Sequence, residues 1–127
     1  MPKNLNANKK ILTIAGSDIL SGGGMQADLA TFAANELYGF CALTSIVTVK
    51  EDKFFVHPVE KELFQEELES LSDVDFSAIK IGLLPNKEIL ELTKNWLTAL
   101  SVKFSKNFWL NRQLLARNQF MKLMIRA

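Results

Sequence analysis

Residues 14–28 read IAGSDILSGGGMQAD, and this stretch decides the fold. It continues an apolar run that begins at Ile11, and it contains Gly16-Ser17-Asp18 followed by the triplet Gly22-Gly23-Gly24. A pattern typical of a helix then begins, so the order predicts a strand, a glycine-rich loop and a helix start. In a parallel α/β sheet, this connection brings backbone N–H groups and a carboxylate to the carboxyl end of the first strand, where ligands bind.

Outward from this stretch, strand-like and helix-like segments alternate. Strands are expected at 10–15, 40–49, 54–59 and 78–84, and helices at 25–36, 60–71 and 86–100, the last with Asn86 as its cap. The run at 40–49 is nearly continuous in apolar residues, as expected for a strand buried on both faces. Such alternation predicts an α/β fold, a mostly parallel sheet with helices on both of its faces.

The composition is that of one ordinary globular domain. The chain has 127 residues, of which 48% are hydrophobic and 23% are charged. No apolar run approaches the roughly 20 residues of a membrane-spanning helix, and the N-terminus lacks the apolar core of an export signal. Cys41 is the only cysteine, which fits a reducing compartment. We therefore expect a cytoplasmic protein that makes no contact with a membrane.

Charge is distributed unevenly along the chain. Residues 1–102 contain nine Lys/Arg and all fourteen Asp/Glu, whereas residues 103–127 contain six Lys/Arg and no acidic residue. In other proteins a basic arm often binds nucleic acid or a membrane, so a nucleic-acid partner stays open here as an alternative. The strand that should follow Leu100 is missing, since residues 103–127 show no β-like run, and residues 113–125 favour a basic helix.

The glycine loop alone leaves two interpretations open. Gly16 is followed by Ser17-Asp18, which does not fit the dinucleotide-binding fingerprint, and the loop lacks the Gly-Lys-Ser/Thr ending of a P-loop. It is either a flexible connection between strand and helix or a site where the backbone approaches a flat ligand closely.

Several short motifs together resemble the hydroxymethylpyrimidine/phosphomethylpyrimidine kinases and the related bacterial pyridoxal kinases. They are IAGSD at 14–18, SGGGMQADL at 21–29, TF at 31–32, YG at 38–39, ALT at 42–44 and AIKIGLL at 78–84. The resemblance implies a ribokinase-like (Rossmann-like) fold and ATP-dependent phosphorylation of a hydroxymethyl group on a vitamin-precursor ring. It also implies ATP and Mg²⁺ as cofactors, and a homodimer for the full-length member.

The resemblance also implies the substrate-binding residues. They are Gly16, Asp18, Gly23, Asp28, Val49 and Leu83. Gly16 would lie against the ring, Gly23 would line the pocket as a small residue, and Leu83 would pack on the ring. Asp28 matches an aspartate near the substrate, although a polar residue at a helix start could equally be a cap. Lys80 matches a motif lysine and could equally form an ion pair at a strand end.

Val49 bears on the choice of substrate. Pyrimidine kinases of this family have a glutamine in the segment aligned with 46–49, where it hydrogen-bonds the ring nitrogen and amine. The Val49 side chain cannot hydrogen-bond the ring nitrogen or the amine of an aminopyrimidine, and an unpaired buried donor costs ~1–3 kcal/mol. Substrate choice between the thiamine pyrimidine and a vitamin B6 ring (pyridoxal, pyridoxine or pyridoxamine) stays open, and the chemistry favours vitamin B6.

Other chemistry-bearing residues have plainer interpretations. His57 has no second metal ligand in view, so we expect no metal site, and Cys41 and Trp96 are expected in the core. The acidic residues of the segment at 60–71 are expected to form a solvated helix face: Glu60, Glu62, Glu66, Glu67 and Glu69.

The resemblance places the nucleotide site, the anion hole and the activating residue in a C-terminal half that is missing here. No glycine follows Gly82, and the expected Val-Val-Asp-Pro-Val strand after Leu100 is absent. We expect residues 1–102 to be the N-terminal part of a kinase domain, truncated, without catalytic residues and inactive alone.

A frameshift would explain both the missing strand and the change of charge. When the codons of residues 108–117 are read in a shifted frame, they can give Leu-Val-Glu-Pro-x-x-x-Cys-Lys, which resembles the missing strand. Residues 103–127 would then be an out-of-frame, poorly ordered tail.

Two rival functions remain. One is a non-catalytic ligand-binding or regulatory protein whose basic tail binds nucleic acid or a partner, although nucleic acid is not the partner that the resemblance implies. The other is an unrelated nucleotide-binding α/β enzyme, which the missing fingerprints disfavour.

Overall fold

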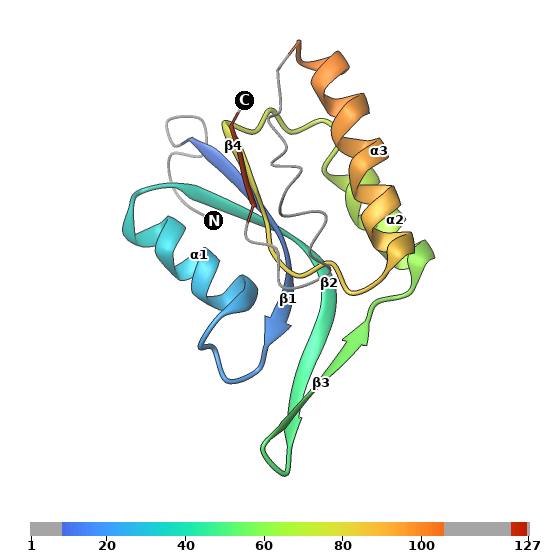
Figure 1. Ribbon diagram of the computed structural model, residues 1–127. Coiled ribbons are helices and arrows are strands. Elements are labelled where there is room, and N and C mark those ends of the chain that lie inside the picture. The colour runs from blue at the N-terminus through green and yellow to red at the C-terminus, as the bar shows by residue number, and fades with distance from the viewer. Residues whose placement is uncertain (1–8, 106–122, 127) are drawn as a thin grey trace.

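The structure is a computed structural model that describes residues 9–105 and 123–126 (Figure 1). In chain order the elements are β1 (Lys10–Asp18), α1 (Gly24–Ala34), β2 (Tyr38–Lys50), β3 (Lys53–Pro58), α2 (Lys61–Ser70), β4 (Ala78–Ile81), α3 (Lys87–Lys103) and β5 (Leu123–Arg126). Each strand and helix expected before residue 104 is present, with ends shifted by a few residues. No helix among the described residues is long and apolar enough to cross a membrane.

The five strands form one sheet in the order β3-β2-β1-β4-β5. β2 and β4 both run parallel to the central strand β1, while β3 and β5 are antiparallel to their neighbours. Helix α1 covers one face of the sheet, and α2 and α3 cover the other (Figure 1). This arrangement confirms the α/β class with helices on both faces. It also shows that the sheet is mixed, parallel at its centre and antiparallel at both edges.

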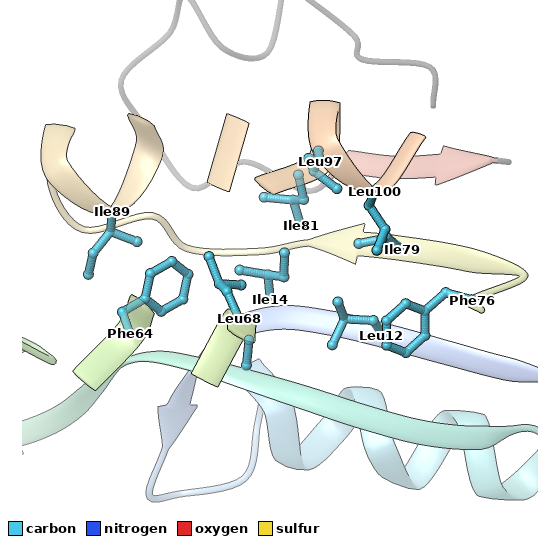
Figure 2. Packing of buried hydrophobic residues seen from close by; sticks show 11 residues of the cluster. Leu12, Ile14, Phe64, Leu68, Phe76, Ile79, Ile81, Ile89, Leu97 and Leu100 are labelled. Atoms are coloured by element: carbon cyan, nitrogen blue, oxygen red, sulfur yellow. The ribbon is translucent and has the colours of Figure 1, made fainter. Parts of the chain in front are cut away.

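The main core lies between the sheet and the helices α2 and α3 (Figure 2). Leu12 and Ile14 of β1 alternate with Thr13, so their side chains share one face of the sheet. They pack with Phe64 and Leu68 of α2 and with residues of β4 and α3 in one buried cluster. Full burial of side chains of this size stabilises the fold by ~1.5–3 kcal/mol each.

The start of α3 confirms Asn86 as its cap. Asn86 Oδ1 accepts a 2.9 Å hydrogen bond from the Ile89 N–H, which satisfies one of the unpaired donors of the first helical turn. Trp96 of the same helix is partly buried at the border of the core, where its indole N–H donates to Ser72 Oγ at 3.0 Å.

Two expectations about the strands are wrong. β2 is not buried on both faces along its whole length, because from Ser45 onward it pairs with β3 in a hairpin that extends beyond the helices (Figure 1). Ile46 is 43% exposed there. The expectation of no β-like run after Lys103 also fails, since β5 pairs with β4. The predicted basic helix at 113–125 is therefore wrong for residues 123–125, and its remainder lies outside the described residues.

Candidate functional site

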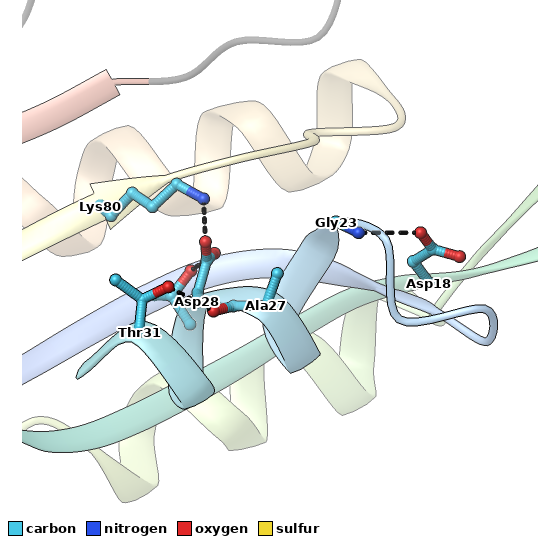
Figure 3. A network of polar contacts seen from close by, with 7 residues as sticks. Asp18, Gly23, Ala27, Asp28, Thr31 and Lys80 are labelled. Carbon is cyan, nitrogen blue, oxygen red and sulfur yellow. Dashed lines mark hydrogen bonds and ion pairs between the residues drawn. The ribbon is translucent and has the colours of Figure 1, made fainter. Parts of the chain in front are cut away.

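Asp18, the last residue of β1, organises the loop that leads into α1. Its Oδ1 accepts a hydrogen bond from the Leu20 N–H and its Oδ2 one from the Gly23 N–H, both at 3.0 Å. Its carbonyl oxygen accepts a third from the Ser21 N–H at 2.8 Å. Figure 3 shows the Asp18 carboxylate facing Gly23 across the loop. The predicted carboxylate is thus at the strand end, and both of its oxygens are used by the loop itself.

Gln26 joins the first turn of α1 to the end of β1. Its Oε1 accepts a 3.0 Å hydrogen bond from the Asp18 N–H, and its Nε2 donates to Ser17 Oγ at 2.7 Å. Sequence reasoning did not single out Gln26. Two signals could have indicated a role in holding the loop: its position three residues after Gly23, and its place in the motif at 21–29.

Two glycines are required by the close approach of backbone segments. A Cβ on Gly24 would lie 2.5 Å from the Gly16 carbonyl oxygen, and Gly24 has φ +64°, a conformation that L side chains rarely adopt. A Cβ on Gly16 would lie 2.6 Å from Ser45 Oγ. The glycine loop is therefore not simply a flexible connection, because Gly24 at its end packs closely against the end of β1.

A cavity of about 270 Å³ lies at the carboxyl ends of β1, β2 and β4. Its lining consists of Ala15, Gly16, Asp18, Gly23, Gly24, Val47, Phe54, Lys80, Gly82 and Leu83. This is the edge of an α/β sheet at which ligands bind. The lining is mostly apolar with few polar groups, which is the usual composition of a small-molecule site.

Four of the six predicted substrate residues line this cavity: Gly16, Asp18, Gly23 and Leu83. The other two, Asp28 and Val49, are not in its lining. Val49 pairs with Phe54 across the β2–β3 hairpin, two residues beyond Val47 on the same side of β2. It therefore lies next to two lining residues rather than at the cavity itself. Val47, Phe54 and Gly82 line the cavity without having been predicted to do so.

Asp28 instead belongs to a polar network beneath the cavity. One carboxylate oxygen accepts a 2.7 Å hydrogen bond from Thr13 Oγ1, and the other forms an ion pair with Lys80 Nζ. In Figure 3 the Lys80 side chain reaches from β4 to Asp28 on α1. The capping alternative for Asp28 is wrong, because Gly23 is the N-cap residue of α1 and no side chain caps this helix end. The ion-pair alternative for Lys80 is confirmed.

Cys41 is held in an unreactive state. Burial, reinforced by the negative charges of Glu67 and Asp28, raises the pKa of its thiol to about 12. Its Sγ donates to Met25 Sδ at 3.5 Å. A thiol with so high a pKa is a poor nucleophile. Cys41 is only partly buried and lies outside the core cluster, so the expectation that it is a core residue is wrong.

Glu67 departs from the expected solvated face. Its Oε1 accepts a 2.7 Å hydrogen bond from the Leu43 N–H, and its Oε2 is buried without a partner among the described residues. Burial raises the pKa of this carboxyl, although the hydrogen bond from Leu43 acts in the opposite direction. The reason is the short β3 strand, whose pairing with β2 starts at Ser45 and leaves the Leu43 N–H for α2 to satisfy.

The described residues contain no group of three or more His, Cys, Asp or Glu that could hold a metal ion. His57 Nε2 instead lies 3.0 Å from Thr48 Oγ1 on the exposed hairpin.

A family model described as phosphomethylpyrimidine kinase matches residues 18–105, which include the loop and most of the cavity. The chain belongs to this family.

Relatives in the family act on two kinds of ring. A putative pyridoxine kinase from Staphylococcus epidermidis is 45% identical over 87 residues, which cover 67% of this chain and 32% of that protein. A hydroxymethylpyrimidine/phosphomethylpyrimidine kinase from Haemophilus influenzae is 38% identical over 91 residues, covering 70% of this chain and 34% of that protein. The chain therefore spans about a third of the length of the curated relatives it matches.

The fold agrees with solved members of the family. The pyridoxal kinase from Staphylococcus aureus, in complex with AMP-PCP and pyridoxal, has 43% sequence identity and a TM-score of 0.69. The match covers 74% of this chain and 36% of that one. The ribokinase-like expectation is thereby confirmed for a fragment of the family's domain.

Proposed function

We propose that this chain contributes the ring-binding side of an ATP-dependent kinase that phosphorylates a hydroxymethyl group on a vitamin-precursor ring. The observation that supports this most strongly is the cavity at the carboxyl ends of β1, β2 and β4. Gly16, Gly23 and Leu83 of its lining come from the motifs that resemble those of the family. A flat aromatic ring suits such a narrow, mostly apolar space.

The apolar residues of the β2–β3 hairpin favour a vitamin B6 ring as substrate. Val47, Phe54 and the neighbouring Val49 present no side-chain donor or acceptor on this side of the cavity. An aminopyrimidine edge placed there would leave its donors unpaired, which costs ~1–3 kcal/mol for each buried group. We propose pyridoxal, pyridoxine or pyridoxamine, with the hydroxymethylpyrimidine as the alternative.

Phosphoryl transfer needs more than a ring site. It depends on positioning the nucleotide and on stabilising charge, for which ATP and Mg²⁺ supply the phosphoryl group and the neutralising cation. The described residues offer no metal-binding cluster. We propose, as the family resemblance implies, that this chain contributes no catalytic residue and binds the ring without transferring phosphate when it is alone.

We also propose that the protein is cytoplasmic and that a full-length member forms a homodimer. The single thiol, Cys41, and its packing against Met25 are compatible with a cytoplasmic protein. The family resemblance suggests a homodimer for a full-length member, and sedimentation of such a member would test this.

A matched pair of glycine substitutions tests the ring site. Gly23 lines the cavity and Gly22 does not, and a Cβ at either position meets only an Asp18 carboxylate oxygen, at 3.9 and 3.6 Å respectively. Neither Gly23→Val nor Gly22→Val should therefore disturb the fold severely. We expect Gly23→Val to weaken pyridoxal binding by about tenfold or more, measured by titration calorimetry, and Gly22→Val to leave it nearly unchanged. Equal effects of both variants would contradict the assignment of the cavity.

A further inference from the structure

Lys80 is fixed at the wall of the cavity by two residues that do not line it. Asp28 forms an ion pair with its ammonium, and Thr13, which is completely buried, donates to the other oxygen of Asp28. The side chains of Lys80 and Asp28 are only 19% and 13% exposed. A long, flexible side chain is thus held in one place between β4 and α1.

The Lys80 ammonium has hydrogen-bonding capacity left over. A lysine has three N–H donors, and Asp28 is its one side-chain partner in the described part of the chain. One hydrogen bond to a carboxylate leaves N–H donors of the ammonium available for a ligand.

The rest of the described lining offers the ligand no other side-chain donor. Both oxygens of Asp18 already accept hydrogen bonds from the loop, and a carboxylate cannot donate. The remaining lining residues are glycines and apolar residues. A ligand that fills this cavity therefore meets one strong side-chain donor, and it comes from β4.

We infer that Lys80 donates a hydrogen bond to an oxygen on the substrate ring, and that Asp28 acts through it as a positioning residue. This inference rests on the proposed function and specifies the kind of ring. A hydroxyl on a pyridine ring is acidic, and its oxyanion forms a strong, charge-assisted hydrogen bond with an ammonium. The amino group of an aminopyrimidine is itself a donor and cannot accept from Lys80, so such a ring offers the ammonium only its uncharged ring nitrogens, which are weaker acceptors than an oxyanion.

Two ligands that differ by one oxygen test the inference. Pyridoxine has the ring hydroxyl, and 3-deoxypyridoxine lacks only that group. We expect the 127-residue chain to bind pyridoxine at least about tenfold more tightly, as is typical of a hydrogen bond to a charged group. Lys80→Arg, which retains a charged donor, should keep most of this preference. Asp28→Asn should reduce it, because the ammonium is no longer held in place.

The double variant Asp28→Asn/Lys80→Met separates a ligand contact from a structural ion pair. It removes both charges together, so it leaves no unpaired charge below the cavity. We expect its affinities for the two ligands to become equal, while binding of 3-deoxypyridoxine stays close to that of the unmodified chain. Partial unfolding would lower both affinities by the same factor, so their ratio is a valid readout even for a destabilised variant.

The outcomes distinguish this inference from the proposed function. If the double variant keeps the preference for pyridoxine, Lys80 does not contact the ring oxygen, and the inference is overturned while the ring site stands. If the unmodified chain binds both ligands equally, the inference is likewise overturned. If it binds neither ligand, the proposed function itself fails, and the inference that rests on it fails too.

Discussion

The backbone N–H of Leu43 in β2 donates a 2.7 Å hydrogen bond to the side chain of Glu67 in α2. A carboxylate thus takes the place of a strand partner at a point that β3 does not reach. The second oxygen of Glu67 is buried without a partner among the described residues, so the ionised form is poorly solvated. This contact makes the stability of the domain sensitive to pH.

Glu67→Gln should change how stability depends on pH. Burial raises the pKa of Glu67 above its usual value of 4.5, so the folded state binds this proton more tightly than the unfolded state. The resulting stabilisation is complete below about pH 4.5 and is lost as pH rises through the folded-state pKa. Glutamine does not ionise, so the variant does not lose stability in this way as the pH rises. Its free energy of unfolding in urea, relative to that of the parent chain, should therefore increase between pH 4 and pH 7.

Glu66→Gln is the matched control for this measurement, because Glu66 lies beside Glu67 on α2 and is exposed. It should leave the pH dependence as it is in the parent chain. If the free energy of unfolding of Glu67→Gln depended on pH as that of the parent chain does, ionising Glu67 would not destabilise the fold and the prediction would be wrong.

Gly24→Ala should destabilise the fold strongly. Its positive φ disfavours any side chain, and the new Cβ would meet the Gly16 carbonyl oxygen at 2.5 Å. We expect a loss of about 1–3 kcal/mol in the free energy of unfolding. Gly22→Ala, where a Cβ meets only Asp18 Oδ2 at 3.6 Å, should cost less than about 0.5 kcal/mol. A tolerated Gly24→Ala would mean that the loop does not pack against β1 as described.

Asn86→Ala should remove the cap of α3. The loss of its hydrogen bond to the Ile89 N–H is expected to cost about 1 kcal/mol, measured by urea unfolding. Asn95→Ala, at an exposed position inside the same helix, replaces asparagine by a better helix former and should be neutral or slightly stabilising. Similar losses for the two variants would indicate that the cap contributes nothing specific.

Cys41 should react slowly in the folded protein. At pH 8 a thiol with a pKa of about 12 has almost no thiolate, and the thiolate is the form that reacts with iodoacetamide. Alkylation followed by mass spectrometry should be at least about a hundredfold slower without urea than in 8 M urea. Comparable rates in the two conditions would show that Cys41 is accessible and ionised.

Much of the fold follows from local patterns in the sequence. The glycine loop after β1, the cap at Asn86 and the apolar faces of α2 and α3 were all predictable, because they depend on residues a few positions apart. Gly16 and Leu83 also lie in the predicted site. Both sit where parallel strands end, and strand ends converge at one edge of a sheet.

Contacts between distant segments were not predictable in the same way. Asp28 and Lys80 are 52 residues apart, and only the three-dimensional structure shows that they pair with each other. Glu67 shares a helix with exposed acidic residues, and nothing local distinguishes it from them. β5 pairs with β4 although its sequence, Leu-Met-Ile-Arg, is too short to indicate a strand. Whether residues 103–127 are an out-of-frame tail stays a prediction, which the nucleotide sequence would test.

The central claim is that this chain binds a substrate ring at the carboxyl ends of β1, β2 and β4. Titrating the ¹⁵N-labelled chain with pyridoxine, followed by amide chemical shifts, tests it most directly. We predict saturable shifts for Gly16, Gly23, Gly82 and Leu83, and little change for amides at the far end of the sheet, such as Lys10 and Ala78. Saturable shifts confined to residues outside the cavity, or none at all, would contradict the account.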